Sequence, residues 1–97
     1  MKISVLSLAR NDLKQIHQYL SEFGEVQPKK FRASFEKFCT QVTDMPYMFS
    51  QYEYNKIYRK AIITYDYLIF YQVDENEGLV KIYRVLHGKR NAELLMD

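Results

Sequence analysis

Hydrophobic residues recur at helical spacing in the first quarter of the chain. Leu13, Ile16, Leu20 and Phe23 follow one another at intervals of three, four and three residues. This spacing places their side chains on one face of an amphipathic helix, with polar residues on the other faces. Gly24 comes directly after the last of them and is suited to a left-handed helix end. The pattern therefore predicts a first helix that ends near Gly24.

A second helical pattern follows at once. Pro28 fits the first turn of a helix, where its missing N–H is not needed, and Pro46 favours an end at the preceding residue. The apolar positions between them alternate in spacings of four and three: Phe31, Phe35, Phe38, Val42 and Met45. Two helices joined by a short glycine-containing loop are expected to form an antiparallel hairpin.

The remaining periodic segments are rich in β-branched and aromatic residues and predict strands. One lies at the start of the chain, and three follow the helices: 3–8, 57–64, 67–73 and 79–87. Tyr65-Asp66 and the polar loop from Asp74 to Gly78 are the expected turns, while residues 47–55 are expected to form an ordered, aromatic loop. Residues 91–97 could form a short C-terminal helix. The predicted fold is α+β, in the order β-α-α-β-β-β, with the helical hairpin packed on a mainly antiparallel four-stranded sheet.

Length and composition narrow the class of protein. The chain has 97 residues, of which 47% are hydrophobic and 27% charged, with a formal net charge of +2. These values predict one soluble domain over residues 1–97, without a global field that would attract nucleic acid or membrane. The opening residues lack the apolar core of a signal peptide, and no long apolar run predicts a membrane span. We therefore expect a cytoplasmic protein that does not bind membranes.

Metal and cofactor chemistry finds no support in the residue types. His17, His87 and Cys39 are the only histidines and cysteine, and they are too scattered for the ligand spacings of zinc sites. The three glycines form no phosphate-binding loop. We expect no metal and no cofactor, and we expect Cys39, on an apolar helix face, to be a buried thiol.

Basic residues gather in two strand regions. One group comprises Lys81, Arg84, His87, Lys89 and Arg90, and the other comprises Lys56, Arg59 and Lys60. If the two strands lie in one sheet, the groups could form a positive patch that contacts phosphates, or they could be solvated charges at strand ends. Nine tyrosines, most of them between positions 47 and 71, could likewise stack on bases or pack on half-buried strands.

Several segments together resemble a known family. They are Ala9-x-x-Asp12-Leu13-x-x-Ile16-x-x-Tyr19-Leu20, Tyr58-Arg59, Tyr67-Leu68-Ile69-Phe70-Tyr71 and Arg84-Val85-Leu86-His87-Gly88-x-Arg90. In this order the chain resembles the RelE/ParE superfamily, the toxins of type II toxin-antitoxin systems, often described as plasmid stabilisation proteins. The resemblance covers essentially the whole chain, and its order of elements agrees with the predicted one.

The resemblance implies one of two activities. ParE-like members poison DNA gyrase and are not nucleases, whereas RelE-like members are ribosome-dependent, metal-free mRNA endonucleases, or mRNA interferases. The 67–71 and 84–88 segments look more like ParE-type members. Leu68, Ala61 and Met96 stand where RelE-like nucleases carry an arginine, a lysine and a tyrosine. The resemblance thus favours a gyrase inhibitor, with the ribosome-dependent nuclease as the alternative.

Each alternative implies its own site residues. For a gyrase inhibitor, the target-binding residues would be Arg59, Arg84, Lys89 and Arg90. For a nuclease, Arg59 and Arg90 would hold phosphate and His87 would act as acid or base, since cleavage at the ribose 2′-OH needs groups that move protons and stabilise the charged phosphate.

Both alternatives imply a cognate antitoxin as partner. Such a partner would lay a helix or an extended segment across the apolar surface of the hairpin and sheet. The expected contacts are Leu13 on the first helix and the aromatic residues Tyr52 and Tyr54, which are predicted to be exposed in the loop after the second helix.

Overall fold

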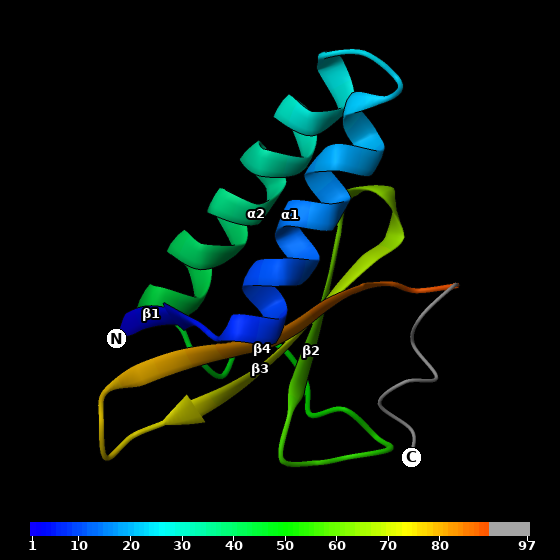
Figure 1. Ribbon diagram of the computed structural model, residues 1–97. Helices are drawn as coiled ribbons and strands as arrows, with labels where there is room; N and C mark the ends of the chain where they lie inside the picture. Colours follow the sequence, from blue (N-terminus) through cyan, green and yellow to red (C-terminus); the bar gives the residue numbers. More distant parts are fainter. Residues whose placement is uncertain (90–97) are drawn as a thin grey trace.

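Two helices lie side by side across one face of a four-stranded sheet in the computed structural model of the chain, which describes residues 1–89 (Figure 1). The elements, in chain order, are β1 Lys2–Val5, α1 Ser7–Ser21, α2 Val26–Asp44, β2 Arg59–Ile63, a short 3-10 turn η1 Thr64–Asp66, β3 Tyr67–Asp74 and β4 Leu79–His87. The predicted order β-α-α-β-β-β and the α+β class are confirmed. The short C-terminal helix predicted over 91–97 lies outside the described residues.

The sheet is mixed, with the strand order β1-β4-β3-β2. β2 pairs with β3 and β3 with β4 in antiparallel fashion, whereas β1 runs parallel to β4. The mainly antiparallel sheet is therefore confirmed. β1 forms one edge, so Ile3 and Val5 are half-buried, less covered than a strand inside the sheet.

The helices begin slightly earlier than their apolar patterns indicate. α1 ends at Ser21, and Gly24 follows in the connecting loop with a φ of 104°, a left-handed value that glycine adopts readily. α2 begins at Val26, so Pro28 falls in its first turn, where no intrahelical N–H is lost. The helix ends at Asp44, one residue before the predicted boundary at Met45.

The main core lies between the helices and the sheet. Phe38 of α2 packs edge-on against Tyr71 of β3, with ring centroids 5.5 Å apart, and Phe31 packs in the same way against Tyr67 at 5.2 Å. The buried residues of this core are Ala9, Ile16, Leu20, Phe31, Phe38, Val42, Ala61, Tyr67, Ile69, Tyr71, Val80, Ile82 and Val85. Burial of this apolar surface fixes the hairpin on the sheet.

A second cluster covers the opposite face of the sheet. The loop between α2 and β2 brings Tyr52 and Tyr58 against Leu68, Phe70 and Leu86. The expectation of an ordered, packed loop is thus confirmed. Because β3 is covered on both faces, its side chains from 67 to 71 are all buried, which explains a continuous apolar run instead of alternation.

Both predicted turns are present. Tyr65 and Asp66 join β2 to β3 with φ values of 58° and 61°, and Gly78 closes the loop before β4 with a φ of 68°. The glycine fits its loop at no steric cost, whereas a tyrosine in the left-handed region is unusual and strained.

Cys39 is less covered than expected. The thiol is half-buried on α2, packed against the main core. Burial, with a smaller contribution from the nearby Glu36 carboxylate, raises the pKa of Cys39 to about 11. At neutral pH the residue is therefore an unreactive thiol.

Candidate functional site

Arg84 is bound to an acid that is distant in the sequence. Its Nε donates to Oδ2 of Asp12 at 2.8 Å and its Nη2 donates to Oδ1 at 3.0 Å, across 72 residues of chain. The carboxylate, which is 7% exposed, also accepts the backbone N–H of Val85 at 3.0 Å. The hydrogen bonds to Asp12 raise the pKa of Arg84. The guanidinium proposed as a target contact is thus turned toward α1.

The local strand pairing explains why the Asp12 carboxylate meets both Arg84 and the backbone of Val85. The pairing of β1 with β4 ends at Ile82. Next to this point the pairing of β3 with β4 shifts in register, so that Phe70 lies opposite Arg84 and Tyr71 lies opposite Ile82. Beyond this point, the N–H of Val85 has no β1 residue opposite it. α1 crosses β4 there and supplies the Asp12 carboxylate in place of a strand carbonyl.

The sequence analysis did not identify Asp12 as the partner of Arg84. A signal was available, because Asp12 stands four residues before Ile16 on the same helical stripe that continues to Leu20. An acid on a buried stripe requires a cationic or hydrogen-bonding partner. The sequence alone does not say that this partner is Arg84.

Lys81 is neutralised by acids from the preceding strand and loop. Its Nζ lies 3.0 Å from Oδ2 of Asp74 and 3.3 Å from Oε2 of Glu77. The hydrogen bond to Lys81 lowers the pKa of Asp74, and the same bonds raise the pKa of Lys81. The basic group identified from the sequence near the C-terminal end is therefore interrupted in space by acids.

Arg59 is held at the other end of the sheet. Its Nη1 donates to the carbonyl of Phe49 at 2.7 Å, and its guanidinium carbon lies 4.9 Å from the centre of the Tyr47 ring. Lys60 similarly lies over Tyr52, at 5.4 Å from the ring centre. Both cations thus help to fasten the aromatic loop to β2.

His87 ends β4 beside an aromatic hollow of about 340 Å³. Its ring packs edge-on against Tyr67 at 5.2 Å, and its Nδ1 accepts the backbone N–H of Lys89 at 3.3 Å. The residues that line the hollow are Tyr19, Leu20, Phe23, Gln27, Tyr65, Tyr67 and His87. Lys89 is exposed, and within residues 1–89 no ion pair joins it to an acid.

The candidate nuclease residues Arg59 and His87 do not converge. Arg59 is paired with Tyr71 of β3, whereas His87 is paired with Tyr67, four positions away along that strand. This offset corresponds to about 13 Å along the strand, with a further two strand spacings of roughly 5 Å each across the sheet. Arg90, the third candidate, lies outside the described residues.

The resemblance places the lysine and the arginine of RelE-like nucleases at two positions that are apolar and covered here. Ala61 is 1% exposed and belongs to the main core, and Leu68 is 9% exposed and belongs to the second cluster. Met96 lies outside the described residues. The two described positions therefore face packed side chains and could not stabilise a phosphate.

The aromatic contacts proposed for an antitoxin separate into two types. Tyr52 is 4% exposed and packs on Phe70, so the expectation that it is exposed is wrong: the loop folds back and inserts this ring into the second cluster. Tyr54 is exposed, and Leu13 is half-buried against the main core. Exposed apolar side chains also occur at the hairpin tip, among them Tyr19 and Phe23.

Most tyrosines examined for base stacking have a packing role. Tyr52, Tyr58, Tyr67 and Tyr71 are all buried. The Tyr71 hydroxyl donates to the carbonyl of Pro46 at 2.9 Å, which ties the start of the aromatic loop to the core. Burial, followed by a hydrogen bond with Tyr83, raises the pKa of Tyr58.

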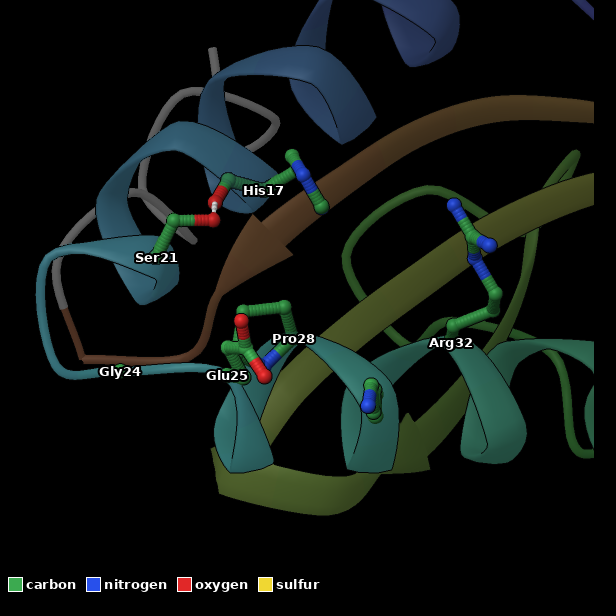
Figure 2. Close-up of a pocket in the computed structure, with 7 residues that line it drawn as sticks. His17, Ser21, Gly24, Glu25, Pro28 and Arg32 are labelled. Atoms are coloured by element: carbon green, nitrogen blue, oxygen red, sulfur yellow. Dashed lines mark hydrogen bonds between the residues drawn. The ribbon is translucent and has the colours of Figure 1, made fainter.

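A shallow hollow of about 410 Å³ lies between the two helices near their connection. Figure 2 shows His17 on α1, with Pro28 and Arg32 on α2 around the same hollow. The Ser21 hydroxyl donates back to the carbonyl of His17 at 2.7 Å. His17 is exposed and makes no catalytic constellation there.

Two further features bear on the class of protein. Over residues 1–89, no group of three or more His, Cys, Asp or Glu side chains is placed to hold a metal ion. Neither described helix has the length and apolarity needed to cross a membrane.

The amino-acid sequence of the chain was compared with models of known protein families. The family model of the ParE toxin of the type II toxin-antitoxin system parDE matches residues 3–92, nearly the whole chain. The chain belongs to the ParE toxin family. A comparison with curated proteins gave no match.

Membership of the ParE toxin family gives the geometry a context. A toxin of a type II toxin-antitoxin system has a cognate antitoxin as partner. In this ParE toxin exposed apolar residues occur on the helical hairpin, on the aromatic loop and, at Ile62, on β2, whereas the basic residue Lys89 follows the end of β4.

Proposed function

We propose that this ParE toxin inhibits bacterial growth in the cytoplasm by poisoning DNA gyrase, without itself breaking a bond. The observation that carries this proposal is the separation of the candidate catalytic groups. Arg59 and His87 are paired with residues of β3 that lie four positions apart, and a metal-free nuclease needs such groups around one phosphate. A non-enzymatic inhibitor has no such requirement, because its contacts can be spread over a surface.

The target-binding surface we propose includes Lys89, Arg90 and Arg59. Lys89 is exposed and has no acidic partner within the described part of the chain, so its charge is available to a phosphate or carboxylate. Arg84 contributes indirectly, because its pairing with Asp12 fixes the strand that leads to Lys89.

The cognate antitoxin is proposed to cover the hairpin and the aromatic loop. Tyr19 is exposed on α1 and Phe23 on the loop that follows it, and Tyr54 is 59% exposed on the aromatic loop. Leu13 lies between the helix surface and the core. A helix or extended segment that buries these side chains would supply apolar burial, which dominates the energetics of such docking.

The experiment that tests the target is pulse labelling of DNA and protein synthesis in the first minutes after controlled induction, together with a cleavage assay on purified gyrase. We expect DNA synthesis to stop first and the toxin to increase gyrase-linked DNA breaks. An immediate stop in translation, with mRNA cleavage that His87→Ala abolishes, would overturn the proposal in favour of a RelE-like nuclease.

A further inference from the structure

The chain leaves β4 through three consecutive residues that are each held in place. The His87 ring packs edge-on against Tyr67, with the ring planes at 86°. The Gly88 N–H donates to the carbonyl of Asp66 at 2.9 Å. The Lys89 N–H donates to Nδ1 of His87 at 3.3 Å. The path of the chain is therefore fixed immediately before the basic pair that we propose as target contacts.

Gly88 lies where a side chain would be crowded by the turn. Its φ is not in the positive range, so backbone conformation does not demand a glycine. A Cβ at position 88 would lie 3.1 Å from the carbonyl oxygen of Asp66 and 3.6 Å from Cγ of Leu68. The oxygen contact is tighter than ordinary van der Waals packing, and the oxygen belongs to the backbone. A side chain at this position would push the Asp66 carbonyl away by a few tenths of an ångström and so disturb the contact between the end of β4 and the turn.

The turn that receives this hydrogen bond is itself strained and anchored. Tyr65 has φ 58° and ψ 27°, and Asp66 has φ 61°. Aspartate tolerates this region, whereas a tyrosine does so only when its surroundings hold it. The Tyr65 ring packs against the main core, and the preceding Thr64 N–H donates to Oγ of Ser34 on α2 at 3.2 Å. The turn is thus a fixed point between α2 and the end of β4.

We propose that the Tyr65-Asp66 turn and Gly88 form a clamp whose function is to orient Lys89 toward the target. They are positioning residues, and the inference rests on the proposed function, in which Lys89 and Arg90 contact the gyrase–DNA complex. A side chain whose backbone is already fixed loses less conformational freedom on binding. The strain at Tyr65 is retained because the turn carbonyl must point at Gly88.

The test compares two glycine variants in the full chain. Gly88→Ala forces a Cβ against the Asp66 carbonyl, whereas Gly78→Ala strains a left-handed position with open space around it, far along β4 from the clamp. The folded fraction of each variant is measured by circular dichroism. Equal concentrations of folded protein are then titrated against purified gyrase and plasmid DNA. We expect Gly88→Ala to need roughly five- to tenfold more protein for the same DNA cleavage. Gly78→Ala should match the parent, and equal potency of the two variants would overturn the clamp.

A third variant separates this inference from the proposed function. If Lys89→Ala with Arg90→Ala abolishes gyrase poisoning while Gly88→Ala leaves it intact, the target surface stands and the clamp is wrong. If the double variant poisons gyrase like the parent, the proposed contact itself is wrong.

A measurement on the unaltered protein covers the case in which Gly88→Ala does not fold. The amide hydrogen of Gly88 should exchange with solvent at least about tenfold more slowly than in an unstructured chain, because opening the clamp must precede exchange. Exchange at the unstructured rate would overturn the inference.

Discussion

Two cations of β4, three residues apart, differ in what surrounds them. Arg84 pairs through two hydrogen bonds with a buried carboxylate from α1, and the same carboxylate holds the backbone of Val85. Lys81 pairs with Asp74 and Glu77, which belong to the adjacent strand and loop and lie toward solvent. The first pair joins distant parts of the fold, whereas the second joins neighbours that the hairpin already brings together.

The comparison shows that a run of basic residues in a sequence does not make a basic surface. Arg84 is used to fasten α1 to the sheet, and Lys81 is compensated by acids. Lys89, past the end of β4, has no such partner within residues 1–89. Among the basic residues of β4 and its exit, those available to a target therefore lie nearer the C-terminal end than the sequence pattern indicates.

The largest expected effect is that of Arg84→Ala on stability. It leaves the Asp12 carboxylate buried without a cation, and we expect the free energy of unfolding to fall by about 3–5 kcal/mol, measured by urea denaturation at pH 7. Arg84→Lys, which keeps the charge but loses the two-pronged bond, should lie between this variant and the parent. A loss below about 1 kcal/mol would mean that the pair is not structural.

A second prediction concerns binding. Lys89→Ala with Arg90→Ala should weaken association with gyrase roughly tenfold through loss of charge-assisted hydrogen bonds, measured by the toxin concentration that gives half-maximal DNA cleavage. Lys81→Ala removes one positive charge from a compensated site and is the control, with parent-like potency expected. If Lys81→Ala were the more damaging change, the target surface would lie on the other part of β4.

A third prediction sharpens the contrast in stability. Lys81→Ala should lower the melting temperature far less than Arg84→Ala, because its ion pairs are partly exposed and screened by solvent, whereas the Asp12 carboxylate is buried. Adding salt should reduce the small difference between Lys81→Ala and the parent, while the deficit of Arg84→Ala should persist. Thermal unfolding by circular dichroism at low and high ionic strength distinguishes the two.

The smallest expected effect depends on pH. Lys81 lowers the pKa of Asp74 below its ordinary value of 3.8, so the pair stabilises the fold fully above that value and loses its contribution as the pH falls through the lower pKa of the folded state. The difference in melting temperature between the parent and Lys81→Ala should therefore shrink only below about pH 4. A difference that disappeared near pH 6 would point to another group.

Local patterns in the sequence were sufficient for much of the fold. The spacing of Leu13, Ile16 and Leu20 predicted α1, and the β-rich run from Leu79 to His87 predicted β4 with the bounds that are observed. The turn at Tyr65-Asp66 was placed correctly as well. In each case the determinant lies within a few residues, namely side-chain periodicity or turn chemistry.

The features that escaped prediction depend on contacts between distant segments. Asp12 meets Arg84 only after α1 crosses β4 beyond the end of β1. Tyr52 is buried because its loop returns to the far face of the sheet, where Phe70 and Leu86 lie. The acids that neutralise Lys81 lie near it, but this contact could not be predicted before the pairing of β3 with β4 was known.

The parallel pairing of β1 with β4 also determines when the fold can be completed during synthesis. Val5 lies opposite Ile82, so the first strand waits for its partner while 77 further residues are translated, counted as 82 − 5. At bacterial rates of about 5–20 residues per second, this delay is roughly 4–15 s. α1 and α2 emerge early, but the Asp12 carboxylate has no arginine to hold until β4 is made. A chain interrupted before β4 would therefore lack both the pairing partner of β1 and the exit toward Lys89.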